Sequence, residues 1–318
     1  MRVSGTPHSN KDEMTAICIP ISESKSYSFM DVARGLFELD YPKKKLYVVF
    51  ALDDFGAKTV ESKIEKFIEK WPYPENCFVV TTTLKGNDPN CSDIIPWKTR
   101  ARFAATLRNL YTSFVVDNLP KAQSIFSVGS DIVLEPKSLK ILRGMDKEIA
   151  SGLYVSRIQH RPLALSYANG EWSYDAVDLA STEPFMADWS GLDCALIQRE
   201  VFTQVNWNDF SVDKYGIGED GYFFLEAKEK GYQLWVNPRV KPLHIQDDGQ
   251  AVAARPVPSL GLIISCPECG WTNKLGKTWK DIEVGCGNCR HIFYADPFWR
   301  ERVLDETAKG AGVSASII

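Results

Sequence analysis

The fold is decided by one stretch of the sequence, Ser124-Ile-Phe-Ser-Val-Gly-Ser-Asp-Ile-Val-Leu-Glu-Pro136. Its apolar beginning is typical of a buried parallel strand, and Gly129 ends that run. Asp131 therefore follows the carboxyl end of the strand, where open α/β sheets bind their ligands. A carboxylate there suits a divalent cation that grips a diphosphate, because hard cations prefer oxygen ligands. Taken alone, however, Asp131 is better explained as the cap of the following helix.

Apolar strands and amphipathic helices alternate on both sides of this stretch. Early strands are expected at residues 14–21, 45–52, 76–83 and 124–128. Apolar residues at helical spacing follow the first two strands and predict an amphipathic helix after each of them. A long helix is also expected at about residues 97–118. Later extended runs are expected at residues 149–156, 192–197, 233–237 and 240–245. The alternation predicts parallel βαβ units in a nucleotide-binding type of α/β sheet.

Composition excludes several classes of protein. The chain has 318 residues and a formal net charge of −4, which gives no support to a broad nucleic-acid-binding surface. It contains no apolar run of the ~20 residues that span a bilayer, and residues 1–8 lack the apolar core of a signal peptide. A cytoplasmic protein with no transmembrane segment is therefore expected.

The cysteines fall into two groups. Cys18, Cys77, Cys91 and Cys194 are scattered and are expected to be small core residues in a reducing compartment. The second group forms two Cys-x-x-Cys pairs separated by sixteen residues: Cys266, Cys269, Cys286 and Cys289. Two such pairs complete a tetrahedral thiolate site, so the spacing predicts structural Zn²⁺. Disulfides are the rival interpretation, but nothing in the sequence suggests secretion.

Three further polar features each have a simple structural explanation and a functional one. Asp53 and Asp54 end the second strand, where they suit a base or ribose but also a solvated turn. Glu219 and Asp220 begin a helix, where the helix dipole favours acidic residues in any case. His244 lies in a late extended run, and a single histidine is more often structural than a metal ligand.

In this order, these segments resemble the nucleotide-sugar glycosyltransferases of the GT-A fold, particularly the large family 2 group. The resemblance covers residues 13–246. Its segments are Ile17-Cys-Ile-Pro-Ile-Ser-Glu23, Val48-Val-Phe-Ala-Leu-Asp-Asp-Phe-Gly56, Ser127-Val-Gly-Ser-Asp-Ile-Val-Leu-Glu-Pro136, Tyr215-Gly-Ile-Gly-Glu-Asp-Gly-Tyr-Phe-Phe224 and residues 231–245. It implies an α/β fold with a Rossmann-like mixed sheet flanked by helices. Beyond the region of resemblance, the sequence itself predicts three further segments. They are a linker at residues 247–260, a four-cysteine zinc ribbon at residues 261–296 and a tail at residues 297–318.

The resemblance also implies roles for individual residues. Asp131 and His244 would hold Mn²⁺ or Mg²⁺ on the donor diphosphate. Asp220 would be the general base that activates the acceptor hydroxyl, with Glu219 beside it, in a single inverting displacement. The remaining residues expected to bind the nucleotide sugar are Asp53, Asp54, Pro20, Ser130 and Trp189. Trp189 would stack on a sugar, although a core tryptophan explains it equally well.

One position departs from the family pattern. Gly129 stands where the first aspartate of the usual Asp-x-Asp motif lies, which leaves Asp131 to bind metal with His244, water and the diphosphate. The expected partners are a nucleotide-sugar donor, a saccharide, lipid-linked or protein acceptor, and a protein docked on the ribbon. Nucleic acid is not expected. The alternative hypothesis is a non-catalytic scaffold of the same fold that assembles partners through the ribbon.

Overall fold

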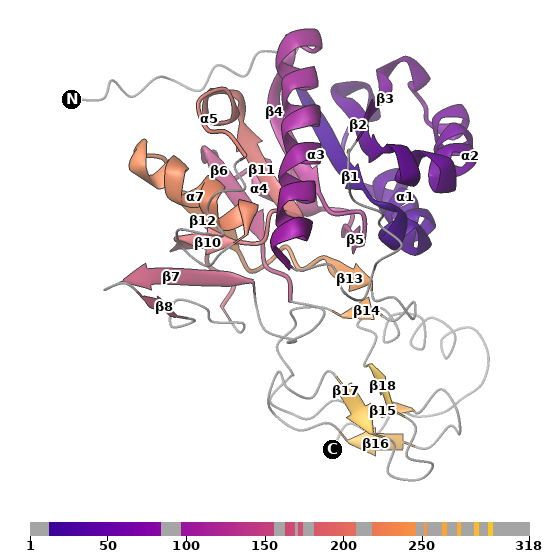
Figure 1. Cartoon of the computed structure of the whole chain (residues 1–318). Coiled ribbons are helices and arrows are strands. Elements are labelled where there is room, and N and C mark those ends of the chain that lie inside the picture. The colour runs from indigo at the N-terminus through magenta and orange to yellow at the C-terminus, as the bar shows by residue number, and fades with distance from the viewer. Residues whose placement is uncertain are drawn as a thin grey trace.

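The computed structural model describes the greater part of the chain (Figure 1). The described residues are 13–83, 97–155, 163–168, 171–173, 181–207, 218–245, 251–252, 263–265, 272–274, 283–285 and 292–294.

The first half of the main sheet is parallel, as the sequence predicts. It contains β1 (Met14–Ile21), β2 (Leu46–Asp53), β3 (Cys77–Thr82) and β4 (Ala122–Val128), in the order β3-β2-β1-β4. Both β2 and β4 pair with β1 in parallel. The chain therefore changes its direction of travel across the sheet between β1 and β4. Ligands of open α/β sheets bind at such a switch point, outside the carboxyl ends of the strands.

The second half makes the sheet mixed. The strand β11 (Cys194–Gln198) runs antiparallel to β4 and to β6 (Ile149–Gly152). Next come β12 (Leu234–Asn237), parallel to β6, and the edge strand β9 (Phe185–Ala187). The strand expected at residues 149–156 is shorter than predicted, because the Leu153 amide donates to Val240, 2.8 Å away, instead of extending the ladder.

Helices cover both faces of the sheet. One face packs on α1 (Phe29–Glu38), α2 (Asp54–Lys70) and α4 (Ser138–Arg143). The other packs on α3 (Trp97–Asn118), α5 (Arg199–Phe202) and α7 (Glu219–Glu229), and α3 crosses the sheet in Figure 1. Alternate side chains of β1 serve the two cores: Ala16 and Cys18 face α3, whereas Ile17 and Ile19 face α1. This alternation is the period of a strand buried on both faces. The 3₁₀ helices are η1 (Glu23–Ser28), η2 (Lys43–Lys45) and η3 (Pro74–Asn76).

Two small sheets lie beside the main one. In the first, β13 (Leu243–Ile245) pairs with β14 (Ala251–Val252) and with β5 (Ile132–Val133). His244 stands opposite Ile132, and the Ile245 amide donates to the Asp131 carbonyl at 2.8 Å, so this register brings His244 to Asp131. The second contains β10 (Trp189–Ser190), β7 (Ala164–Ala168) and β8 (Glu171–Ser173).

Two antiparallel hairpins follow at the C-terminal end. They are formed by β15 (Ile263–Ser265) with β16 (Thr272–Lys274), and by β17 (Glu283–Gly285) with β18 (Ile292–Tyr294). The four cysteines expected to bind zinc lie outside the described residues, as do Cys91 and nearly all of the expected linker and tail. The expected domain boundaries therefore remain predictions. No helix in the described part of the chain has the length and apolar character needed to cross a bilayer.

Among the glycines of the described residues, Gly191 leaves the least room for a side chain. A Cβ atom at Gly191 would lie 2.0 Å from the Tyr154 hydroxyl oxygen. Tyr154 is buried, and its hydroxyl accepts a hydrogen bond from the Asp193 amide at 3.2 Å. The ring therefore fills the space above Gly191 and fixes the segment that leads into β11.

Replacing Gly191 by alanine should destabilise the protein by about 1–3 kcal/mol, because the ring and the backbone would have to move apart. The free energy of unfolding from urea denaturation measures this. The control is Gly144→Ala at the end of α4, where a Cβ atom would lie 3.3 Å from the Lys140 carbonyl oxygen. That variant should change the stability by less than about 1 kcal/mol, and equal losses in the two variants would contradict the packing argument.

Candidate active site

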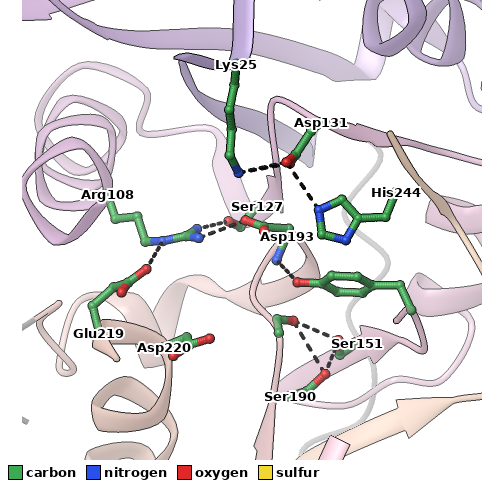
Figure 2. A network of polar contacts seen from close by, with 12 residues as sticks. Lys25, Arg108, Ser127, Asp131, Ser151, Ser190, Asp193, Glu219, Asp220 and His244 are labelled. Carbon is green, nitrogen blue, oxygen red and sulfur yellow. Dashed lines mark hydrogen bonds and ion pairs between the residues drawn. The ribbon is translucent and has the colours of Figure 1, made fainter. Parts of the chain in front are cut away.

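Asp131 lies at the switch point and is completely buried. It follows the carboxyl end of β4, and Lys25 reaches it from η1, which follows the carboxyl end of β1. The Lys25 ammonium nitrogen is 3.0 Å from Oδ1 and 2.9 Å from Oδ2 of Asp131 (Figure 2). The helix-cap explanation of Asp131 is wrong, because α4 begins after Lys137, and within the described residues no side chain caps it.

His244 approaches the same carboxylate from β13. Its Nδ1 is 2.9 Å from the Val155 carbonyl oxygen, which can only accept, so Nδ1 carries the proton. Its Nε2 is 3.2 Å from Oδ2 of Asp131. In the neutral ring this places a nitrogen lone pair against a carboxylate oxygen. Two acceptors at this distance need a proton or a metal cation between them.

The donor set of Asp131 and His244 fits a divalent cation. Imidazole nitrogen and carboxylate oxygen both bind Mn²⁺, and a carbonyl that fixes the tautomer of a histidine is typical of metal sites. Across the residues that the structure describes, no group of three or more His, Cys, Asp or Glu side chains is arranged to bind a metal. If a cation binds there, Asp131 and His244 would be its protein ligands, and water and diphosphate oxygens would complete the coordination.

The structure explains why residue 129 is glycine. A Cβ atom there would lie 2.7 Å from both Cβ and Cγ of Asp193, so the Asp193 side chain occupies the space that an aspartate at 129 would need. Asp193 comes from the segment before β11. An acidic side chain from another part of the chain therefore occupies the space beside Gly129.

Arg108, on α3, joins the acidic residues into one network. It is 5% exposed, and its NH2 nitrogen is 2.8 Å from Oδ1 of Asp193. Its Nε is 3.4 Å from Oε1 of Glu219, and it also donates to the Ser127 hydroxyl at 2.9 Å. Burial raises the pKa of Asp193, but the charges of Arg108 and Lys25 outweigh burial and hold that pKa below its usual value. Asp193 is therefore ionised.

Glu219 and Asp220, in the first turn of α7, differ in their surroundings. Burial, reinforced by the charge of Asp220 and opposed by Arg108, raises the pKa of Glu219 to about 7. Burial also raises the pKa of Asp220, against hydrogen bonding from the Trp189 side chain and the Gly221 amide. The Gly221 amide is 2.7 Å from Oδ1 of Asp220. Burial thus raises the proton affinity of both carboxylates, and an ion pair with Arg108 holds Glu219 in place.

Trp189 faces Asp220 from β10. Its indole nitrogen is buried and meets no acceptor among the described residues at full hydrogen-bond geometry. The Trp189 side chain nevertheless opposes the effect of burial, which raises the pKa of Asp220. The Trp189 side chain is half-buried. Its exposure is therefore intermediate between the two expectations from the sequence, a fully buried core residue and an exposed ring that stacks on a sugar.

The other expected binding residues lie at the same edge of the sheet. Asp53 ends β2 and is 1% exposed, so it is not part of a solvated turn. Asp54 begins α2, and its side chain lies outside the described residues. Pro20 is half-buried in β1, and the Ser130 carbonyl lies 2.6 Å from the Ser28 hydroxyl.

Sequence reasoning missed Lys25, Arg108 and Asp193. Each is a single charged residue without a motif around it, and its partners are distant in the chain. Only the place of Lys25 in the polar turn after the first strand offered a signal, because such turns line the ligand edge of an α/β sheet.

No family model matches the sequence, and no curated protein matches it. Among solved structures, GalNAc-T7 with UDP, GalNAc and Mn²⁺ matches with a TM-score of 0.50 at 13% identity, over 73% of this chain and 43% of that one. The crystal structure of S. aureus TarS 1-349 matches with a TM-score of 0.42 at 13% identity, over 70% and 57%. A197 from STIV matches with a TM-score of 0.42 at 14% identity, over 76% and 93%. The chain thus spans only about half the length of TarS 1-349 and GalNAc-T7. The similarity to GalNAc-T7 confirms the predicted GT-A type of fold.

Replacing Arg108 by methionine should destabilise the protein by about 3–5 kcal/mol, because it leaves the buried Asp193 and Glu219 without their counter-charge. Urea denaturation measures the loss. The control is Arg34→Met, which breaks an exposed pair with Asp31 at 2.8 Å and should cost less than about 1 kcal/mol. A loss at Arg108 no greater than that at Arg34 would show that the network does not hold these carboxylates.

Proposed function

We propose that the protein is a metal-dependent glycosyltransferase that moves a sugar from a nucleoside diphosphate sugar to an acceptor hydroxyl, with inversion at the anomeric carbon. One observation carries the proposal: the Asp131 carboxylate and Nε2 of His244 converge, 3.2 Å apart, at the switch point of a GT-A type of sheet. A saccharide, a lipid-linked sugar or a protein would provide the acceptor hydroxyl.

The donor would lie along the carboxyl ends of the first strands. Asp53 and Asp54 would accept hydrogen bonds from the base or ribose, and Pro20 and Ser130 would line the path to Asp131. GalNAc-T7 was solved with UDP and Mn²⁺, and TarS with UDP and with UDP-GlcNAc. UDP-sugars are therefore the first donors to test.

Asp131 and His244 would hold Mn²⁺ or Mg²⁺, which would supply positive charge for the departing nucleoside diphosphate. Asp220 would take the proton of the acceptor hydroxyl while the oxygen of that hydroxyl forms a bond to the anomeric carbon. The bond from that carbon to the diphosphate oxygen breaks in the same step, and its electron pair leaves with the nucleoside diphosphate. Because burial raises the pKa of Asp220, its carboxylate is a stronger base than an exposed aspartate. Glu219, held by Arg108, would fix the start of α7 and so the position of Asp220.

We also propose that the C-terminal hairpins form a structural zinc ribbon that docks a protein partner. The support is the cysteine spacing together with the two hairpins, since each Cys-x-x-Cys pair falls in sequence between two paired strands. A cytoplasmic location fits, because the described cysteines, Cys18, Cys77 and Cys194, are free thiols.

Replacing Asp220 by asparagine should lower kcat by about 10²–10⁴-fold, because an amide cannot take the acceptor proton. Donor affinity should stay close to that of the wild type. The measurement is release of nucleoside diphosphate from a panel of UDP-sugars with Mn²⁺, together with donor binding by calorimetry. The control is Asp188→Asn, an acidic residue of the neighbouring segment that pairs with Lys228. No activity with any donor in the wild type, or full activity in Asp220→Asn, would contradict the proposed chemistry.

Purified protein should contain about one zinc ion per chain, and a Cys266→Ser, Cys286→Ser double variant should lose it, because each pair then retains a single thiolate. Mass spectrometry of the metal content measures this. Cys77→Ser, which removes a half-buried free thiol, is the control and should keep its zinc. Equal zinc in the two variants would exclude these cysteines as ligands.

A non-catalytic scaffold is the second candidate, and one observation favours it: Lys25 already neutralises Asp131. A scaffold would show no turnover in the wild type, so the Asp220 comparison separates the two hypotheses.

A further inference from the structure

Lys25 provides a positive charge at the place where the proposed metal would bind. Its ammonium contacts both carboxylate oxygens of Asp131, and one of them, Oδ2, also faces His244. A divalent cation between Asp131 and His244 would need that oxygen. The ammonium and the metal therefore compete for one carboxylate.

The position of Lys25 is fixed by its backbone and not by its long side chain alone. The Ser28 hydroxyl lies between the Lys25 carbonyl at 2.8 Å and the Ser130 carbonyl at 2.6 Å. Ser28 is completely buried, so η1 is held against the residue that precedes Asp131. The Lys25 side chain, by contrast, is 30% exposed and Asp131 is not exposed at all. The Lys25 side chain is thus partly accessible to a ligand, whereas the Asp131 carboxylate that it contacts is not.

We propose that Lys25 is a tethered cation of the diphosphate site, which binds the donor diphosphate in the absence of metal and which a divalent cation must displace from Asp131. The inference rests on the proposed function and extends it to a residue that neither the sequence motifs nor the comparisons assign.

The charges of the site support this role. At the carboxylate that would bind the metal, Asp131 is paired with Lys25, and Lys25 also helps to hold Asp193 ionised. A divalent cation added to the Lys25–Asp131 pair leaves an excess of positive charge at that carboxylate. A diphosphate offsets that excess, so the metal should bind weakly alone and more tightly together with a nucleotide. Without Lys25, the two carboxylates would instead attract the metal directly.

The test compares Lys25→Met with wild type in two binding measurements. The first is Mn²⁺ binding without nucleotide, followed by the spin-resonance signal of free Mn²⁺. Its affinity should rise about tenfold in Lys25→Met, because the competing ammonium is gone. The second is UDP binding in EDTA by calorimetry, which should be measurable in wild type and at least about tenfold weaker in Lys25→Met. Lys25→Arg should retain UDP binding in EDTA.

The matched control is Lys140→Met, which removes an exposed lysine that pairs with Asp40. It should leave both affinities unchanged. If the wild-type protein binds UDP with Mn²⁺ but not in EDTA, the inference is wrong, whatever the variants show. Unchanged Mn²⁺ affinity in folded Lys25→Met overturns it as well. Binding of UDP with Mn²⁺ in either case would leave the proposed function standing, whereas no binding of any nucleoside diphosphate under any condition would overturn both.

Discussion

The structure depends on a buried negative charge. Asp131 is completely buried at the carboxyl end of β4, and a carboxylate in that position needs a positive partner, because removing an ion from water costs several kcal/mol. Lys25 supplies that partner from η1, after the end of β1, and Nε2 of His244 faces the carboxylate from β13. The parallel pairing of β1 with β4 in the main sheet and the antiparallel pairing of β5 with β13 in the small sheet beside it bring these segments together. The backbone thus places two side chains that are remote in sequence against one carboxylate.

A second set of charges connects this point to the other half of the molecule. Arg108 on α3 contacts Asp193 before β11 and Glu219 at the start of α7, so it spans the parallel and mixed halves of the sheet (Figure 2). Through Glu219 it fixes the helix that carries Asp220. In the proposed reaction, the donor diphosphate belongs to the Asp131 side and the acceptor hydroxyl to the Asp220 side. Arg108 would then hold the two sides at a constant separation, which is the requirement of a single displacement.

Patterns along the chain were enough to predict most strands of the main sheet and helix α3. Strand and helix periodicity predicted β1 and α3 with the bounds that the structure gives them. The motif order led to Asp131 and His244, which the structure brings together. Lys25, Arg108 and Asp193 could not be predicted, because their partners are far away in the sequence. The contacts Lys25–Asp131, Arg108–Asp193 and Arg108–Glu219 join residues 106, 85 and 111 positions apart, and the spacing of residues within one strand or helix gives no information on such contacts. The departure of Gly129 from the family motif could not be explained from the sequence for the same reason: the Asp193 side chain that fills its space comes from the distant turn before β11.

The central claim is that a divalent cation sits between Asp131 and His244. Electron spin-echo spectroscopy of Mn²⁺ bound with UDP to protein labelled with ¹⁵N-histidine tests it most directly, since it detects an imidazole nitrogen coordinated to the metal. The account predicts one ¹⁵N coupling from the four histidines of the chain, lost in His244→Ala while the ³¹P coupling of the diphosphate remains. Bound Mn²⁺ that shows phosphorus coupling but no histidine nitrogen in the unsubstituted protein would contradict it.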